Sequence, residues 1–209
     1  MRHVVRDFET GVRVGEGSLS RRALLGAGAA GAVVTVPVAG RLLRLGDALG
    51  TPSKAQDVKI LQLVLQVEYT QVAFYEEALA HAQLSGDVRE FAETALGHER
   101  QHLAAVKKAL GSKAGAKPRF AFGDKTSTDA SFMRAAITLE DIAVAGYNGQ
   151  AANLTKPTLA VAAEIVSVEA RHAAWVRALA GEIAAPDPVD KAMTAQQAAS
   201  GLQTLGVRS

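Results

Sequence analysis

The stretch Glu99–His102 reads Glu-Arg-Gln-His, and its outline returns at Glu169–His172 as Glu-Ala-Arg-His. Residues three apart on a helix lie on the same face, one turn above the other. Each stretch therefore presents a carboxylate and an imidazole to the same point. Two copies of this Glu-x-x-His pattern in one chain predict helices that carry metal ligands on their inward faces.

Both stretches lie in longer segments with helical periodicity. We expect helices over about residues 53–84, 87–110 and 129–153, and a fourth that follows Pro157 and ends before Pro186. Apolar residues recur on each segment at alternating steps of three and four, interrupted near the middle by an acid. The four acids are Glu68, Glu99, Glu140 and Glu169.

A carboxylate in the core of a helical bundle is costly unless it is paired or bound to a metal. Counted from the turns between the helices, the four acids stand at similar heights, so their side chains can converge. His102 and His172 stand one turn from two of them. One such acid could be a local accident, but four of them at one level predict a common partner.

The two halves of the chain also match each other. The pattern Glu68-x-x-x-Val-Ala-x-Tyr75 recurs as Glu140-x-x-x-Val-Ala-x-Tyr147, and the two Glu-x-x-His stretches are followed by the same small and apolar residues. This duplication predicts an all-α fold: a four-helix bundle built from two helical hairpins that a long crossover connection, residues 111–129, joins.

The donor set decides which metal is expected. Four carboxylates and two neutral imidazoles suit a pair of divalent ions, because four negative charges balance two dications. Oxygen and nitrogen donors without sulfur favour iron or manganese, whereas calcium prefers more oxygens and no imidazole. The chain has no cysteine, which excludes disulfides and thiolate sites.

In this order the donors resemble the ligand set of the ferritin-like di-iron and di-manganese carboxylate proteins. The resemblance covers about residues 57–183. It implies that Glu99 and Glu169 bridge two metal ions, that the other two glutamates are terminal ligands, and that each histidine binds one ion. The implied metal ligands are Glu68, Glu99, His102, Glu140, Glu169 and His172.

The same resemblance implies two bound iron ions, or two manganese ions, and oxidation of ferrous iron by dioxygen or peroxide. Tyr75 and Tyr147 follow Glu68 and Glu140 by two turns; we expect them either to hydrogen-bond or donate electrons to the metal site, or to be core aromatics. Two other functions stay open: a di-manganese catalase, and a structural or stress-protection protein of the envelope whose metal site is not catalytic.

Three other polar residues near the motifs are weaker candidates for the metal site. His98 lies beside Glu99 but about 100° round the helix, so a role at the surface or a helix interface is expected rather than ligation. Glu164 and Asp141 are candidates to hydrogen-bond a ligand histidine.

The N-terminal 40 residues resemble a twin-arginine export signal, with Ser20–Leu25 reading Ser-Arg-Arg-Ala-Leu-Leu before an uncharged run. The chain is therefore expected to use the twin-arginine translocase and to reach the periplasm, the cell envelope or the medium. The signal is either cleaved or kept as a membrane tether. Together with the C-terminal tail, it resembles the bacterial exported ferritin-like proteins of the desiccation-related type.

The expected organisation is a signal or anchor at 1–40, a linker and helix start at 41–56, the bundle at 57–184, and a tail at 185–209. The tail contains a short helix from about Thr194, and no fifth bundle helix is expected. Beyond the signal, basic and acidic residues are equal in number, so nucleic acid is not an expected partner. Assembly into a homo-oligomer stays open.

Overall fold

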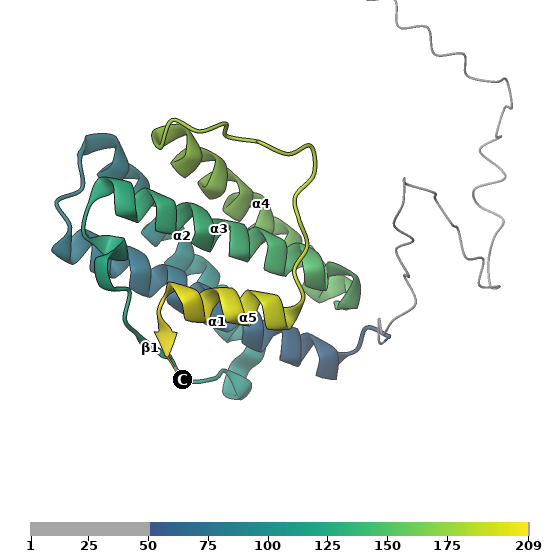
Figure 1. The fold of residues 1–209 in the computed structure, drawn as a ribbon. Coiled ribbons are helices and arrows are strands. Elements are labelled where there is room, and N and C mark those ends of the chain that lie inside the picture. Colours follow the sequence, from purple (N-terminus) through teal and green to yellow (C-terminus); the bar gives the residue numbers. More distant parts are fainter. Residues whose placement is uncertain (1–50, 209) are drawn as a thin grey trace, which may run out of the picture. The chain divides into compact units, whose positions relative to one another are not determined.

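The computed structural model describes residues 51–208. The export-type segment at 1–40 and most of the predicted linker therefore lie outside the described residues. Helix bounds are α1 Lys54–His81, α2 Gly86–Leu110, α3 Asp129–Gln150, α4 Lys156–Leu179 and α5 Ala195–Leu205 (Figure 1). None of these helices is long and apolar enough to cross a membrane.

The predicted all-α bundle of two hairpins is confirmed. Helix α1 packs along α2, and α3 packs along α4, while α1 also contacts α3 and α2 contacts α4. The connection between the hairpins, residues 111–128, holds short 3₁₀ turns at Gly111–Lys113 and Gly123–Thr126 and the two-residue strand β1, Arg119–Phe120. A third 3₁₀ turn, Ala151–Asn153, ends α3.

Local signals explain where the helices begin. The Ser53 hydroxyl accepts a 3.2 Å hydrogen bond from the backbone of Gln56 and caps α1. Thr128 and Ser131 form a reciprocal capping box at the start of α3. Helix α4 has Pro157 in its first turn, where the missing backbone N–H removes no helical hydrogen bond.

The bundle core is divided into two apolar clusters, and the four acids lie where the clusters meet. One cluster contains the aromatic residues Phe74, Phe91 and Phe132, and the other contains Leu65, Leu110 and Ile165. On α2 residues of the aromatic cluster precede Glu99 and residues of the other cluster follow it, and on α4 the order is reversed around Glu169. The polar layer is therefore enclosed on both sides by packed apolar side chains.

The C-terminal tail packs on the bundle, which the sequence does not predict. Helix α5 packs against α3 and α1 (Figure 1), and its Ala198 and Leu202 are buried in the aromatic cluster. The expectation that no fifth helix joins the bundle is therefore wrong. The strand after α5, β2 at Val207–Arg208, pairs antiparallel with β1 and ties the end of the chain to the crossover connection.

Asp57 in the first turn of α1 connects this helix to the start of α4. Its carboxylate accepts hydrogen bonds of 2.9 and 2.5 Å from the backbone and hydroxyl of Thr155, and of 2.7 Å from the Thr158 hydroxyl. The negative charge thus lies at the positive ends of two helix dipoles. Burial raises the pKa of Asp57, but these hydrogen bonds outweigh burial and hold the pKa below its usual value.

Candidate metal centre

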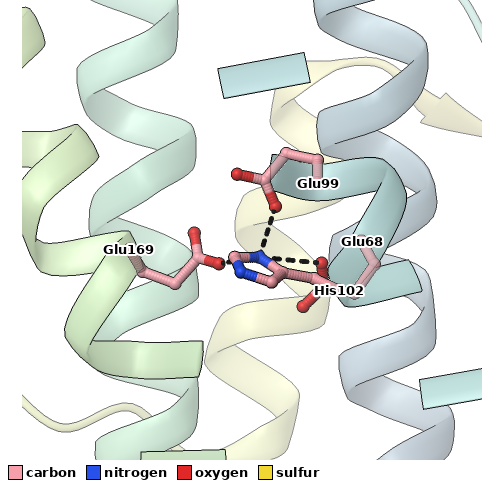
Figure 2. Close-up of side chains that lie close together, drawn as sticks. All are labelled: Glu68, Glu99, His102 and Glu169. Atoms are coloured by element: carbon pink, nitrogen blue, oxygen red, sulfur yellow. Dashed lines mark hydrogen bonds and ion pairs between the residues drawn. The ribbon is translucent and has the colours of Figure 1, made fainter. Parts of the chain in front are cut away.

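All six predicted metal ligands converge in the polar layer of the bundle. Helices α1 and α3 contribute one glutamate each, and α2 and α4 contribute one glutamate and one histidine each. The four glutamates are completely buried, and His172 is 2% exposed. Four of the six side chains appear in Figure 2, where Glu99, Glu169 and Glu68 point toward the His102 ring.

The six residues form two overlapping groups, each with donor atoms within 4.8 Å of one another. We call the first group the His102 half; it contains Glu68, Glu99, His102 and Glu169. The second group is the His172 half; it contains Glu99, Glu140, Glu169 and His172. Glu99 and Glu169 belong to both halves, which is compatible with two metal ions that share two carboxylates.

Distances around the two rings show how closely the halves join. His102 Nδ1 lies 3.0 Å from Glu99 Oε2 and 2.9 Å from Glu169 Oε1. His172 Nδ1 lies 3.0 Å from Glu99 Oε1. The two oxygens of Glu99 therefore face different histidines, as those of a bridging carboxylate would.

The buried glutamates and histidines shift one another's pKa. Burial, and then the charges of Glu169 and Glu99, raise the pKa of Glu68 well above its usual value. Burial and the Glu99 charge raise the pKa of Glu169 to about 8. Burial lowers the pKa of His102, but the Glu169 and Glu99 carboxylates beside its Nδ1 outweigh burial and raise that pKa to about 10.

Several buried donor atoms make no hydrogen bond of good geometry among the described residues, although three of them lie 2.9–3.0 Å from an oppositely charged or polar group. A buried polar atom without a partner costs about 1–3 kcal/mol, and more when it is charged. A pair of cations would satisfy four of these atoms at once and offset the repulsion between the carboxylates. The donors therefore fit a dinuclear site; the four atoms are Glu68 Oε2, Glu99 Oε1, Glu169 Oε1 and His172 Nδ1.

The two tyrosines hold the terminal carboxylates across the hairpins. Tyr147 on α3 donates a 2.7 Å hydrogen bond to Glu68 Oε1, and Tyr75 on α1 donates one to Glu140 Oε1. Burial and the neighbouring carboxylates raise the pKa of both phenols well above the usual value, so both remain protonated donors at neutral pH. Each tyrosine thus contacts the acid of the other repeat.

Two residues contact the ligands although the sequence pattern does not predict it. The buried amide of Gln71 donates hydrogen bonds of 2.7 Å to Glu169 Oε2 and 3.2 Å to Glu140 Oε2. His98 Nδ1 lies 2.9 Å from His172 Nε2, and the two rings stack. Gln71 stands one turn after Glu68, on the same helix face, and this spacing could have revealed it.

The two acids that we expected beside a ligand histidine lie elsewhere. Asp141 accepts a 2.5 Å hydrogen bond from Arg177, and Glu164 is exposed on α4. The prediction that either of them hydrogen-bonds a ligand histidine is therefore wrong. His98 occupies that role because α2 and α4 face each other at this level.

A pocket of about 460 Å³ opens between α2 and α4 beside the polar layer. Both ligand histidines line it, so it connects the cluster with the surface. Its remaining lining residues are His98, Gln101, Val168, Arg171 and Trp175.

Comparison with known sequences agrees with this geometry. The model of the ferritin-like domain family matches residues 56–182, which is more than half of the chain and contains all six predicted ligands. Among curated proteins, no sequence gives a significant match. The fold, the buried cluster of acids and histidines and the family match lead to one conclusion: this chain belongs to the ferritin-like domain family.

Proposed function

We propose that this protein is an exported dinuclear metal protein that oxidises ferrous iron with dioxygen or peroxide. One observation carries the proposal: the His102 half and the His172 half share Glu99 and Glu169. Two shared carboxylates could hold two metal ions close enough to act together. Single-ion sites do not need this overlap.

The residues that would hold the metal pair divide into three roles. Glu99 and Glu169 would bridge, Glu68 and Glu140 would be terminal ligands, and each histidine would bind one ion through Nδ1. Four carboxylates balance two dications, and the mixed oxygen and nitrogen donors suit iron, with manganese as the alternative.

A bound iron pair supplies the redox chemistry, in which electrons pass from ferrous iron, the substrate, to dioxygen or peroxide. The chain's own residues prepare the site for it. Tyr75 and Tyr147 hold the terminal carboxylates in place, and the apolar clusters keep bulk water away from the donors. The pocket between α2 and α4 gives small reactants a path to the two histidines.

The decisive experiment measures metal content and oxygen consumption together. We expect about two iron or manganese ions per chain, and oxygen consumption when ferrous iron is added. The double variant Glu99→Gln and Glu169→Gln should lose both. A matched control, Glu93→Gln with Glu164→Gln, removes one exposed acid from each of the same two helices and should retain both.

Three results separate the alternatives. Manganese in the purified protein together with disproportionation of hydrogen peroxide would support a di-manganese catalase, whose donor set would be the same. Metal that stabilises the fold without any turnover of oxygen or peroxide would support a structural or stress-protection role. Oxidation that survives loss of both bridging glutamates would contradict the catalytic proposal and leave the fold unaffected.

Export is proposed from the sequence of residues 1–40. The twin arginines Arg21 and Arg22 before an uncharged run support it, as does the resemblance to exported ferritin-like proteins of the desiccation-related type. The twin-arginine route moves folded proteins, which would allow the metals to be loaded before export. Replacing both arginines by lysine should retain the protein in the cytoplasm, as cell fractionation would show; unchanged export would contradict this route.

A further inference from the structure

The two sequence repeats that form the site match each other at every ligand, but they differ at two positions beside the ligands. The four glutamates, the two histidines and the two tyrosines all have a counterpart 70 or 72 residues away. Gln71 does not, because its counterpart is Ala143, and neither does His98, because its counterpart is Val168. His98 contacts His172, and Gln71 contacts Glu140 of the same half together with Glu169, which both halves share.

His98 lies where it can accept the hydrogen that His172 carries when its Nδ1 binds a metal. His172 Nδ1 faces the carboxylates, 3.0 Å from Glu99 and 3.6 Å from Glu140, and must be unprotonated to bind a metal. The hydrogen of the neutral ring then resides on Nε2, which lies 2.9 Å from His98 Nδ1, so His172 donates and His98 accepts. Val168 has no acceptor to offer the ring of His102.

Gln71 makes a second difference between the halves. Both terminal glutamates receive a tyrosine hydroxyl on Oε1. Glu140 Oε2 also receives the Gln71 amide, whereas Glu68 Oε2 has no hydrogen-bond partner among the described residues and lies 3.9 Å from His102 Nδ1. Hydrogen bonds to metal-binding carboxylates fix their orientation, and losing such a partner typically weakens metal binding about 10- to 100-fold. The His172 half is therefore the better oriented of the two.

The two histidines also differ in burial. The His172 side chain is 3% exposed, and the His102 side chain is 11% exposed. Phe91 packs edge-on against the His172 ring, with centroids 6.4 Å apart. The His102 half is thus the one more open to solvent at the pocket between α2 and α4.

We propose that the two halves of the dinuclear site are unequal: the His172 half, oriented by His98 and Gln71, binds its metal first and retains it, and the His102 half is the exchangeable position where ferrous iron arrives. This inference rests on the proposed function, because it presumes that the six donors bind two metal ions. His98 and Gln71 are positioning residues here, since each acts through a ligand.

Two matched variants of the full chain measure each half alone. Repulsion between two cations separates the binding steps even in a symmetric site, so the first metal must be compared in single-site proteins. The Glu68→Ala background also carries His102→Ala, so that only the His172 half keeps its four donors; the Glu140→Ala background also carries His172→Ala, so that only the His102 half keeps its four donors. Titration calorimetry with Zn²⁺, which has no redox chemistry, should show at least about tenfold tighter binding to Glu68→Ala.

Variants of His98 then test the cause. His98→Phe keeps a ring for stacking but removes the acceptor; it should weaken Zn²⁺ binding about 10- to 100-fold in the Glu68→Ala background and leave the Glu140→Ala background unchanged. His98→Asn supplies an amide oxygen near the position of Nδ1 and should restore much of the affinity. Gln71→Leu should also weaken binding more in the Glu68→Ala background.

The outcomes distinguish this inference from the proposed function. Equal Zn²⁺ affinities in the two single-site proteins, tighter binding to Glu140→Ala, or an equal effect of His98→Phe in both backgrounds would overturn the inequality alone. Unequal halves in a protein that never oxidises ferrous iron would support the inequality and overturn the proposed function. A chain that binds no metal would overturn both.

Discussion

The hydroxyl of Tyr147 donates a 2.7 Å hydrogen bond to Glu68 Oε1, so a residue of the second hairpin holds the terminal carboxylate of the first. The mirror contact joins Tyr75 to Glu140. These contacts connect the two hairpins at the level of the polar layer. Metal binding and the packing of the hairpins should therefore depend on each other.

Replacing Tyr147 by phenylalanine is expected to weaken metal binding in the His102 half about 10- to 100-fold, because Glu68 loses the donor that orients it. The measurement is Zn²⁺ titration of metal-free protein. Tyr69→Phe is the matched control, because the Tyr69 hydroxyl makes a long 3.5 Å contact with the Gly115 carbonyl and lies outside the two groups of donors. An equal loss of affinity in both variants would contradict the proposed role of Tyr147.

Removing the metals is expected to lower the melting temperature and to make stability depend on pH. In the metal-free folded protein the pKa of Glu169 is raised to about 8 from an ordinary value of 4.5. Its contribution to stability is therefore complete below about pH 4.5 and is lost as the pH rises through about 8. The raised pKa of His102 acts in the same direction, with loss of stability between about pH 6.5 and 10.

Glu169→Gln should flatten the pH dependence of the metal-free protein, and metal should no longer raise its melting temperature by the full amount. Glu164→Gln, an exposed acid on the same helix, is the control and should leave the curve unchanged. Denaturant unfolding between pH 5 and pH 9, with and without a chelator, measures both effects. A metal-free protein that gains stability over this range would show that the acids are not buried together.

Asp57→Asn is expected to destabilise the protein by about 1–2 kcal/mol at neutral pH, because the charge at two helix N-termini is lost. The folded pKa of Asp57 is lowered, so its contribution is present above the unfolded value of 3.8 and disappears as the pH falls through the folded value. The difference between the variant and the unaltered protein should therefore shrink below about pH 4.

The measurement for Asp57 is chemical unfolding from pH 2 to pH 7 with a chelator present throughout. Asp124→Asn, which removes an exposed carboxylate of the crossover connection, provides the control for the loss of one negative charge. A stability gap for Asp57→Asn that persists unchanged at pH 2 would exclude the charge as its cause.

Phe122→Ala is expected to cost about 3–5 kcal/mol, because Phe122 is 1% exposed and packs edge-on against Phe74. This side chain anchors the crossover connection in the aromatic cluster. Phe120→Ala removes the partly buried ring stacked on Phe122 and should cost clearly less. Urea unfolding compares the two, and equal costs would mean that the connection does not depend on the buried ring.

The helical elements and the inward direction of the acids could be predicted from the sequence. Periodicity places Glu68, Glu99, Glu140 and Glu169 on the apolar faces of their helices, and all four are buried. These predictions rest on local geometry, because spacing along one helix determines which residues share a face. That the six converging donors bind metal stays a prediction.

Contacts between side chains of different helices could not be predicted from spacing within one helix. The donation from Gln71 to two glutamates, the pairing of His98 with His172 and the packing of α5 on the bundle depend on how helices rotate and approach one another. Glu164 could accept a hydrogen bond from a ligand histidine, as His98 can, but it lies on the exposed face of α4.

Spacing within single helices was enough to predict an all-helical bundle made from a duplicated hairpin. It also predicted an inward-facing acid on every helix and a histidine one turn after two of these acids. The folded structure was needed to show that Glu99 and Glu169 belong to both halves and that each tyrosine contacts the acid of the other hairpin. These relationships join atoms that are far apart in the chain, and the packing of side chains in the folded core sets the distances between them.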